Sequence, residues 1–171
     1  MKFPNKLVLV RLVILLLLIG CSAEDPVVIQ HRSALLMSTE PAGSVTIEDA
    51  RSNIESETQI VLTGRIGTPD LTNWWSTTDD ATIFISEGMP DSHYNPGDGH
   101  DPASCPFCKR KWKLEDSMAI VRFVDKSGQQ IPVGANKLLD VKDGDVVVVK
   151  GVASLDESGY LIVEASGLLI R

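Results

Sequence analysis

The chain has 171 residues, a formal net charge of -7 and 43% hydrophobic residues. The apolar residues are gathered in runs, which excludes a chain that is disordered throughout, and the length allows one domain with appendages. An acidic chain is in general a poor partner for nucleic acid or anionic lipid, so the composition predicts that nucleic acid is not the partner. Aromatic residues make up only 5%, so the core is expected to be aliphatic.

The chain begins with a segment typical of export. Basic residues precede an unbroken aliphatic run at 12–19, and Gly20-Cys21 follows. This pattern predicts a secretory signal peptide over residues 1–20, because the run is too short for a comfortable membrane span. The stretch 18–21 (LIGC) resembles a bacterial lipobox, which implies a lipoprotein with Cys21 as its lipid-modified first residue. The alternatives are an uncleaved anchor and an ordinary signal with an incidental cysteine.

A lipoprotein is attached to the bacterial cell envelope, so the membrane is the first expected partner. Acyl chains on Cys21 give stable attachment. Ser22 rather than aspartate follows the cysteine and favours the outer membrane over the inner one. Cys105 and Cys108 then remain as an even pair in an oxidising compartment.

The stretch after the lipid site has no clear hydrophobic period. Prolines interrupt residues 21–44, which predicts a lipid-anchored tether with little fixed structure. Thr46, with an acidic residue three positions later, predicts the N-cap of a short helix over 46–53. The folded domain is expected over 45–171.

Strand patterns dominate from residue 58 onward. A turn at 125–128 leads into a return segment at 129–133, and one helical turn is expected at 135–139. Gly64 and Gly151 would let strongly curved strands bend. The main strands are expected at 58–67, 81–86, 118–124, 146–153 and 160–165. Arg65 and Arg122 lie in these strands and are expected to pair with carboxylates across the sheet.

This all-β order resembles the OB-fold, a five-stranded Greek-key barrel, here expected over 58–171. The phrases at 144–148 (GDVVV) and 150–152 (KGV) recur in OB-fold proteins. The stretches 40–43, 63–67 and 150–171 are similar to small OB-fold lipoproteins of planctomycete type and, more distantly, to periplasmic bacterial OB-fold proteins. That resemblance implies a fold and a compartment, but no activity. Another small β-barrel or an open sandwich is the alternative.

A long insertion separates the second and third strands, because the periodicity stops between residues 87 and 117. It contains His93, His100, Cys105 and Cys108. A C-x2-C pair places two thiolates on one ion, and two histidines complete a tetrahedral set, so zinc is the predicted cofactor. Copper is the alternative in a secreted protein. Four protein ligands leave no open position for water, so we expect a structural site, no catalytic residue and no enzyme.

The two cysteines of the insertion have two further interpretations. The Cys-Pro-Phe-Cys phrase is similar to thioredoxin-type motifs, and basic residues at 109–111 favour a reactive thiol. The strand-and-helix context of that family is missing, so thiol–disulfide or metal-redox chemistry with Cys105 and Cys108 is only an alternative. The third interpretation is an inert disulfide beside solvated histidines.

Two adjacent tryptophans, Trp74 and Trp75, follow the first strand. In OB-folds this loop borders the face that takes oligonucleotides or oligosaccharides, and tryptophans stack on sugars or bases. Alternatively, one ring plugs the barrel end and the other is partly exposed. The sequence thus predicts a binding or interaction module for an unknown protein or small-molecule ligand. Single-stranded nucleic-acid or oligosaccharide binding by the barrel face is the alternative.

Overall fold

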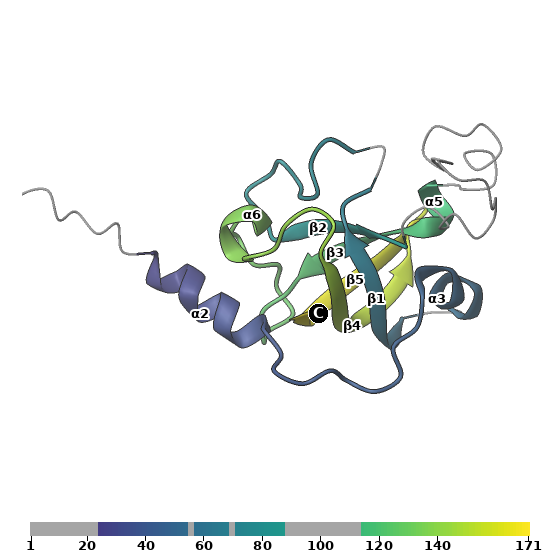
Figure 1. Cartoon of the computed structure of the whole chain (residues 1–171), viewed down its shortest axis with the longest axis horizontal. Helices are drawn as coiled ribbons and strands as arrows, with labels where there is room; N and C mark the ends of the chain where they lie inside the picture. Colours follow the sequence, from purple (N-terminus) through teal and green to yellow (C-terminus); the bar gives the residue numbers. More distant parts are fainter. Residues whose placement is uncertain (1–23, 55–56, 69–70, 88–113) are drawn as a thin grey trace, which may run out of the picture.

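The computed structural model describes residues 24–54, 57–68, 71–87 and 114–171 (Figure 1). Five strands form a closed barrel in the order β1-β2-β3-β5-β4. All neighbouring pairs are antiparallel except β3 and β5, which are parallel. The strands are β1 (Thr58–Ile66), β2 (Thr82–Ser86), β3 (Met118–Phe123), β4 (Val146–Leu155) and β5 (Leu161–Ile170).

The helical turn α6 (Ala135–Leu138) joins β3 to β4. This element and the strand order are those of the OB-fold, so the predicted fold class is confirmed. The expected return segment at 129–133 is reduced to a single bridge between Val124 and Gln130. Most of the predicted insertion, residues 88–113, lies outside the described residues, and the chain resumes in α5 (Leu114–Ser117).

The core inside the barrel is mainly aliphatic, as the composition predicts, although it includes Phe123. Alternate residues of each strand point inward, and on β2 these are Ile83 and Ile85, both fully buried. Val121 and Phe123 do the same on β3. Burying one such side chain stabilises the fold by about 1.5–3 kcal/mol. The intervening residues therefore form the outer face of the barrel.

Gly151 lies at an irregularity in the antiparallel pairing of β4 with β5. The register shifts between Lys150 and Gly151, and a Cβ on Gly151 would come within 2.3 Å of the carbonyl oxygen of Glu164. Only glycine permits so close an approach of the two backbones. The register shift and the close approach give this glycine a structural role at the position where the sequence predicts a bend.

The segment that precedes the barrel differs from the expected unstructured tether. Residues 26–35 form the helix α2 (Pro26–Leu35), whose N-cap is Asp25. Arg32 of α2 donates hydrogen bonds to the carbonyl oxygens of Leu138 and Lys137 at 2.6 and 3.0 Å, which docks the helix on α6. The weak period hid this helix, but the local signal was present, because an aspartate followed by proline is a typical helix start. Among the described residues, no helix is both long and apolar enough to span a membrane.

Residues 36–45, here called the arm, connect α2 to α3 (Ile47–Asn53) along the outside of the barrel (Figure 1). The Met37 N–H donates to the carbonyl oxygen of Leu168 on β5 at 2.8 Å. The Val45 N–H donates to Val61 on β1 at 2.9 Å. The arm therefore joins the edges of two strands rather than hanging free.

The helix α3 begins where the sequence predicts. The side chain of Thr46 accepts a hydrogen bond from the Asp49 N–H at 3.1 Å, and Ile47 and Ala50 are buried. The Glu48 N–H donates to the carboxylate of Glu87, just after β2, at 2.7 Å. The helix is thereby attached to the end of β2.

Candidate ligand-binding face

Trp74 and Trp75 lie in the connection between β1 and β2, which folds back along β2. The Phe84 N–H donates to the carbonyl oxygen of Trp74 at 2.9 Å, and Trp75 pairs with Ile83 across an isolated antiparallel bridge. β1 pairs with β2 at only two positions, so this returning segment covers the edge of β2 that β1 leaves open.

The two indole rings pack against each other. Their centroids are 5.0 Å apart and their planes meet at 69°, an edge-to-face arrangement. Both rings are half-buried and contact the barrel core. The contact with the core agrees with the interpretation that an indole ring plugs the barrel end, although both rings are partly exposed. Their exposed parts border the outer face of β2. A ligand-binding role for the pair stays a prediction.

A row of apolar side chains crosses the outer face of the barrel. Phe84 on β2 is opposite Ile120 on β3, and Ile120 is beside Ile162 on β5. Phe84 and Ile120 are half-buried, whereas Ile162 is buried. Phe84 therefore supplies the aromatic surface of this row, and it is partly exposed. Composition alone did not single out this residue, although the alternation at 81–86 was a usable signal.

Two arginines flank Phe84 on the neighbouring strands. Arg65 of β1 is opposite Ser86, and Arg122 of β3 is opposite Thr82. Ser86 and Thr82 are the next outward residues of β2 on either side of Phe84, so each arginine is a diagonal neighbour, about 7–8 Å away. We call Arg65, Phe84 and Arg122 the flanked aromatic.

Both arginines of the flanked aromatic are exposed. Neither forms an ion pair within the part of the chain that the structure describes. Arg65 instead donates to the carbonyl oxygen of Gly144 at 2.6 Å. The expected pairing with carboxylates across the sheet is thus not found, although Glu164 lies beside Arg122 in the β3–β5 register. Their charge remains available to a ligand.

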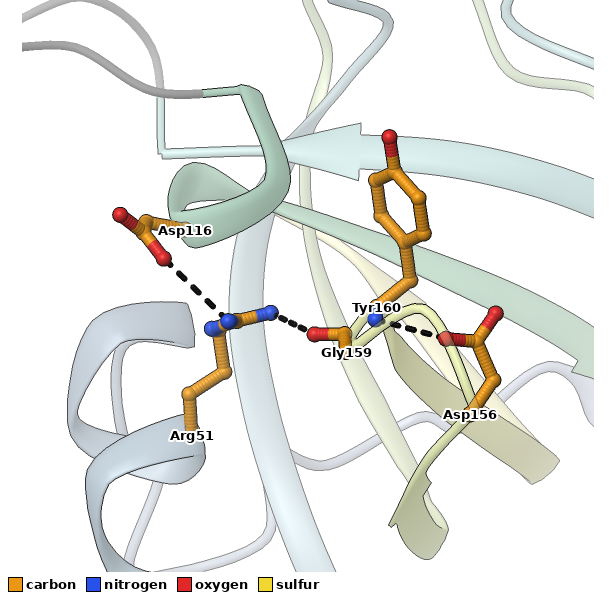
Figure 2. A network of polar contacts seen from close by, with 5 residues as sticks. All are labelled: Arg51, Asp116, Asp156, Gly159 and Tyr160. Atoms are coloured by element: carbon orange, nitrogen blue, oxygen red, sulfur yellow. Dashed lines mark hydrogen bonds and ion pairs between the residues drawn. The ribbon is translucent and has the colours of Figure 1, made fainter.

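The turn between β4 and β5, residues 156–160, borders the same face at the end of the barrel away from Trp74 and Trp75. The carboxylate of Asp156 accepts hydrogen bonds from the N–H groups of Ser158 at 2.9 Å and Tyr160 at 2.8 Å. Arg51 of α3 donates to the carbonyl oxygen of Gly159 and contacts Asp116 at 3.2 Å (Figure 2). This turn is therefore tied to α3 and, through it, to the segment before β3.

A groove of about 740 Å³ separates α2 from the turn after β3. Asp125 in its lining accepts from the hydroxyl and the N–H of Ser127 at 2.6 and 2.8 Å. These hydrogen bonds, that of the hydroxyl first, lower the pKa of Asp125. The Asp125 carboxylate is occupied by hydrogen bonds within its own turn. The groove is therefore a weaker candidate for a ligand-binding site than the outer face.

The remaining predicted site residues lie outside the described residues. They are the lipidation site Cys21 and the proposed metal ligands His93, His100, Cys105 and Cys108. Within the described ranges, no group of three or more histidine, cysteine or acidic side chains is arranged to hold a metal ion. The zinc, disulfide and redox interpretations therefore stay predictions.

Comparison with protein-family models gave no match, and neither did comparison with curated proteins. Solved structures do match, among them Schizosaccharomyces pombe Pot1pC bound to single-stranded DNA (CGGTTACGGT). The two chains are 16% identical, the match covers 69% of this chain and 73% of that one, and the TM-score is 0.35. The fold assignment rests on the strand order of the chain itself.

Proposed function

We propose that this protein is a non-catalytic OB-fold binding module that holds a short single-stranded nucleic acid across the outer face of β2 and β3. The flanked aromatic is the observation that carries this proposal. Phe84 offers a ring to one base, while Arg65 and Arg122 stand on either side at positions suited to the phosphates. Trp74 and Trp75 border the face and extend the stacking surface.

Stacking supplies most of the affinity in this proposal. A base on an aromatic side chain contributes about 1–3 kcal/mol, and this contribution tolerates any base. Guanidinium groups bind phosphate through paired hydrogen bonds, which fixes the course of the backbone. The module is therefore expected to prefer single strands and to show little sequence preference.

The acidic net charge of the whole chain opposes this ligand, and the sequence taken alone predicts against it. Local charge outweighs the total at short range, because interactions beyond a Debye length of about 8 Å are screened at physiological salt. The two arginines lie within that distance of a ligand on Phe84. They can therefore attract the phosphates even though the net charge of the chain does not.

An oligosaccharide is the other ligand suited to an OB-fold face. A neutral sugar would stack on Phe84 and on the tryptophans, but it would give the positive charges of Arg65 and Arg122 no counter-charge. The arginines therefore favour the nucleic acid. The response to salt separates the two ligands, since only the charged one releases counterions on binding.

Fluorescence anisotropy with a labelled oligothymidylate of about ten nucleotides tests the proposal, with a chito-oligosaccharide as the competing probe. The Phe84→Leu variant keeps an apolar side chain but removes the ring, and Arg122→Gln removes one charge. Both are expected to weaken binding. Lys150→Gln is the matched control, because it removes an exposed charge from β4, away from the face. Equal effects of Arg122→Gln and Lys150→Gln would contradict the proposed face.

The location and the metal are separate parts of the proposal. We place the module at the bacterial cell envelope, anchored through lipid on Cys21, with a zinc-type site of His93, His100, Cys105 and Cys108 in its insertion. The signal-like leader and the C-x2-C pair support these two statements from the sequence. Thiol–disulfide or metal-redox chemistry at Cys105 and Cys108 is the competing hypothesis.

A further inference from the structure

Tyr160 stands on the same face as the flanked aromatic. It precedes Leu161, which is buried in the barrel and is opposite Ala119 of β3. Because side chains alternate along a strand, Tyr160 and Ile162 both belong to the outer side. Ile162 belongs to the apolar row that also contains Phe84. Tyr160 itself is half-buried. The face thus has an aromatic residue near each end of the barrel.

The turn that carries Tyr160 is organised only in part by its own residues. Asp156 accepts two N–H groups of the turn, and its own N–H donates to the carbonyl oxygen of Tyr160 at 3.0 Å. Gly159 has φ +85°, a conformation that favours glycine. Its carbonyl oxygen accepts its hydrogen bond from Arg51, which lies 108 positions earlier in the sequence (Figure 2).

Arg51 is held firmly enough to orient that turn. Its side chain is only 19% exposed, whereas that of its other partner, Asp116, is 52% exposed. The helix that bears it is capped by Thr46 and is attached to the end of β2 through Glu87. The guanidinium thus joins a fixed helix to the carbonyl group that immediately precedes Tyr160.

We infer that Arg51 is a positioning residue for the ligand-binding face, acting through Gly159 to present the ring of Tyr160 as a second stacking platform. This inference rests on the proposed function, because it needs a ligand with planar groups on that face. Arg51 itself does not contact the ligand. Without the Arg51 side chain, the Tyr160 ring would still be present, but it would move with the turn.

Oligothymidylate affinity of full-chain variants tests the inference. Tyr160→Leu is expected to weaken binding by roughly 5- to 150-fold, the loss of one stacked base. Arg51→Met, which keeps an apolar stem and loses both contacts, should reproduce part of that loss. Asp116→Asn is the matched control, because it removes the exposed ion pair and leaves the Gly159 contact. Its effect should stay below about twofold.

A double-mutant cycle measures the coupling between Arg51 and Tyr160 in oligothymidylate affinity. This coupling distinguishes a positioning role from a general effect on the fold. If Arg51 acts through Tyr160, Arg51→Met has no further effect once Tyr160 is leucine. Equal weakening by Arg51→Met with and without the Tyr160 ring would overturn the inference. Thermal unfolding monitors the fold, and if Arg51→Met does not fold, Arg51→Lys replaces it in the same cycle.

The outcomes separate this inference from the proposed function. A wild-type chain that does not bind oligothymidylate contradicts the proposed function. A wild-type chain that binds, with loss in Phe84→Leu but unchanged affinity in Tyr160→Leu and Arg51→Met, contradicts only the inference.

Discussion

Arg171 and Glu40 form a two-point ion pair that joins the end of β5 to the arm. Nε of Arg171 donates to Oε2 of Glu40 at 3.1 Å, and Nη2 donates to Oε1 at 2.5 Å. Two parallel contacts of this kind fix geometry better than a single one. Together with the backbone bonds of Met37 and Val45, the pair holds the arm across the outside of the barrel.

This ion pair predicts how the arm responds to pH. The hydrogen bond from Arg171 lowers the pKa of Glu40 below its ordinary value of 4.5. A depressed carboxyl pKa contributes stability that is present above 4.5 and is lost as the pH falls through the lowered value. Amide hydrogen exchange at Met37 and Val45 should therefore accelerate, relative to intrinsic rates, as the pH drops below that range. In Glu40→Gln the acceleration should be absent, and if it persists unchanged, another group is responsible.

The N-cap of α3 predicts a loss of stability on truncation. Thr46→Ala removes the acceptor for the Asp49 N–H and should lower the free energy of unfolding by about 1 kcal/mol. Thr46→Ser should restore most of it. Urea unfolding measures the change, with Thr77→Ala in an exposed loop as the control. Equal losses in Thr46→Ala and Thr77→Ala would argue against the cap.

The close approach at Gly151 predicts a strong effect of a single methyl group. Gly151→Ala would place Cβ against the backbone of Glu164, which cannot move away without breaking the β4–β5 ladder. We expect destabilisation of about 1–3 kcal/mol or more by chemical denaturation. Gly134→Ala is the control, because there the nearest atom belongs to the side chain of Asn136. A stability close to that of the wild type in Gly151→Ala would refute the packing argument.

The flanked aromatic predicts a shallow salt dependence. Two arginines on phosphates give a slope of about -1.4 in a plot of log affinity against log salt, at about 0.7 per contact on a single strand. Arg122→Gln should reduce the slope by about half, while Phe84→Leu should lower the affinity and leave the slope unchanged. Anisotropy titrations over a range of salt concentrations measure both quantities. A steep slope would indicate a different, more basic surface.

The predicted zinc site in the insertion has its own test. Mass spectrometry of the purified chain should find about one zinc ion per molecule, the content of a four-ligand structural site. His93→Ala and Cys108→Ser should each remove it, whereas the matched substitution His31→Ala should not. Absence of metal together with absence of free thiols would identify a disulfide between Cys105 and Cys108 instead.

Local pattern was sufficient for much of the fold. Alternation at 81–86 and 118–124 predicted two strands within one residue of their observed bounds, and Thr46 predicted the start of α3. These signals lie between neighbours in the chain, so they survive without knowledge of the rest. The helix at Pro26–Leu35 was missed because its period is weak and Arg32 docks it on a distant element.

The candidate site depended on contacts that the sequence does not contain. Arg65, Phe84 and Arg122 come from three strands, and each is unremarkable in its own segment. Only the pairing of β1 with β2 and of β2 with β3 sets the register that places them side by side, since a slip of one residue would turn every side chain to the other face. The Arg51–Gly159 contact likewise needs α3 and the β4–β5 turn to meet at one end of the barrel. The sequence thus determined the elements and the polarity of their faces, while tertiary structure decided which faces meet, because register is a property of paired strands and not of one.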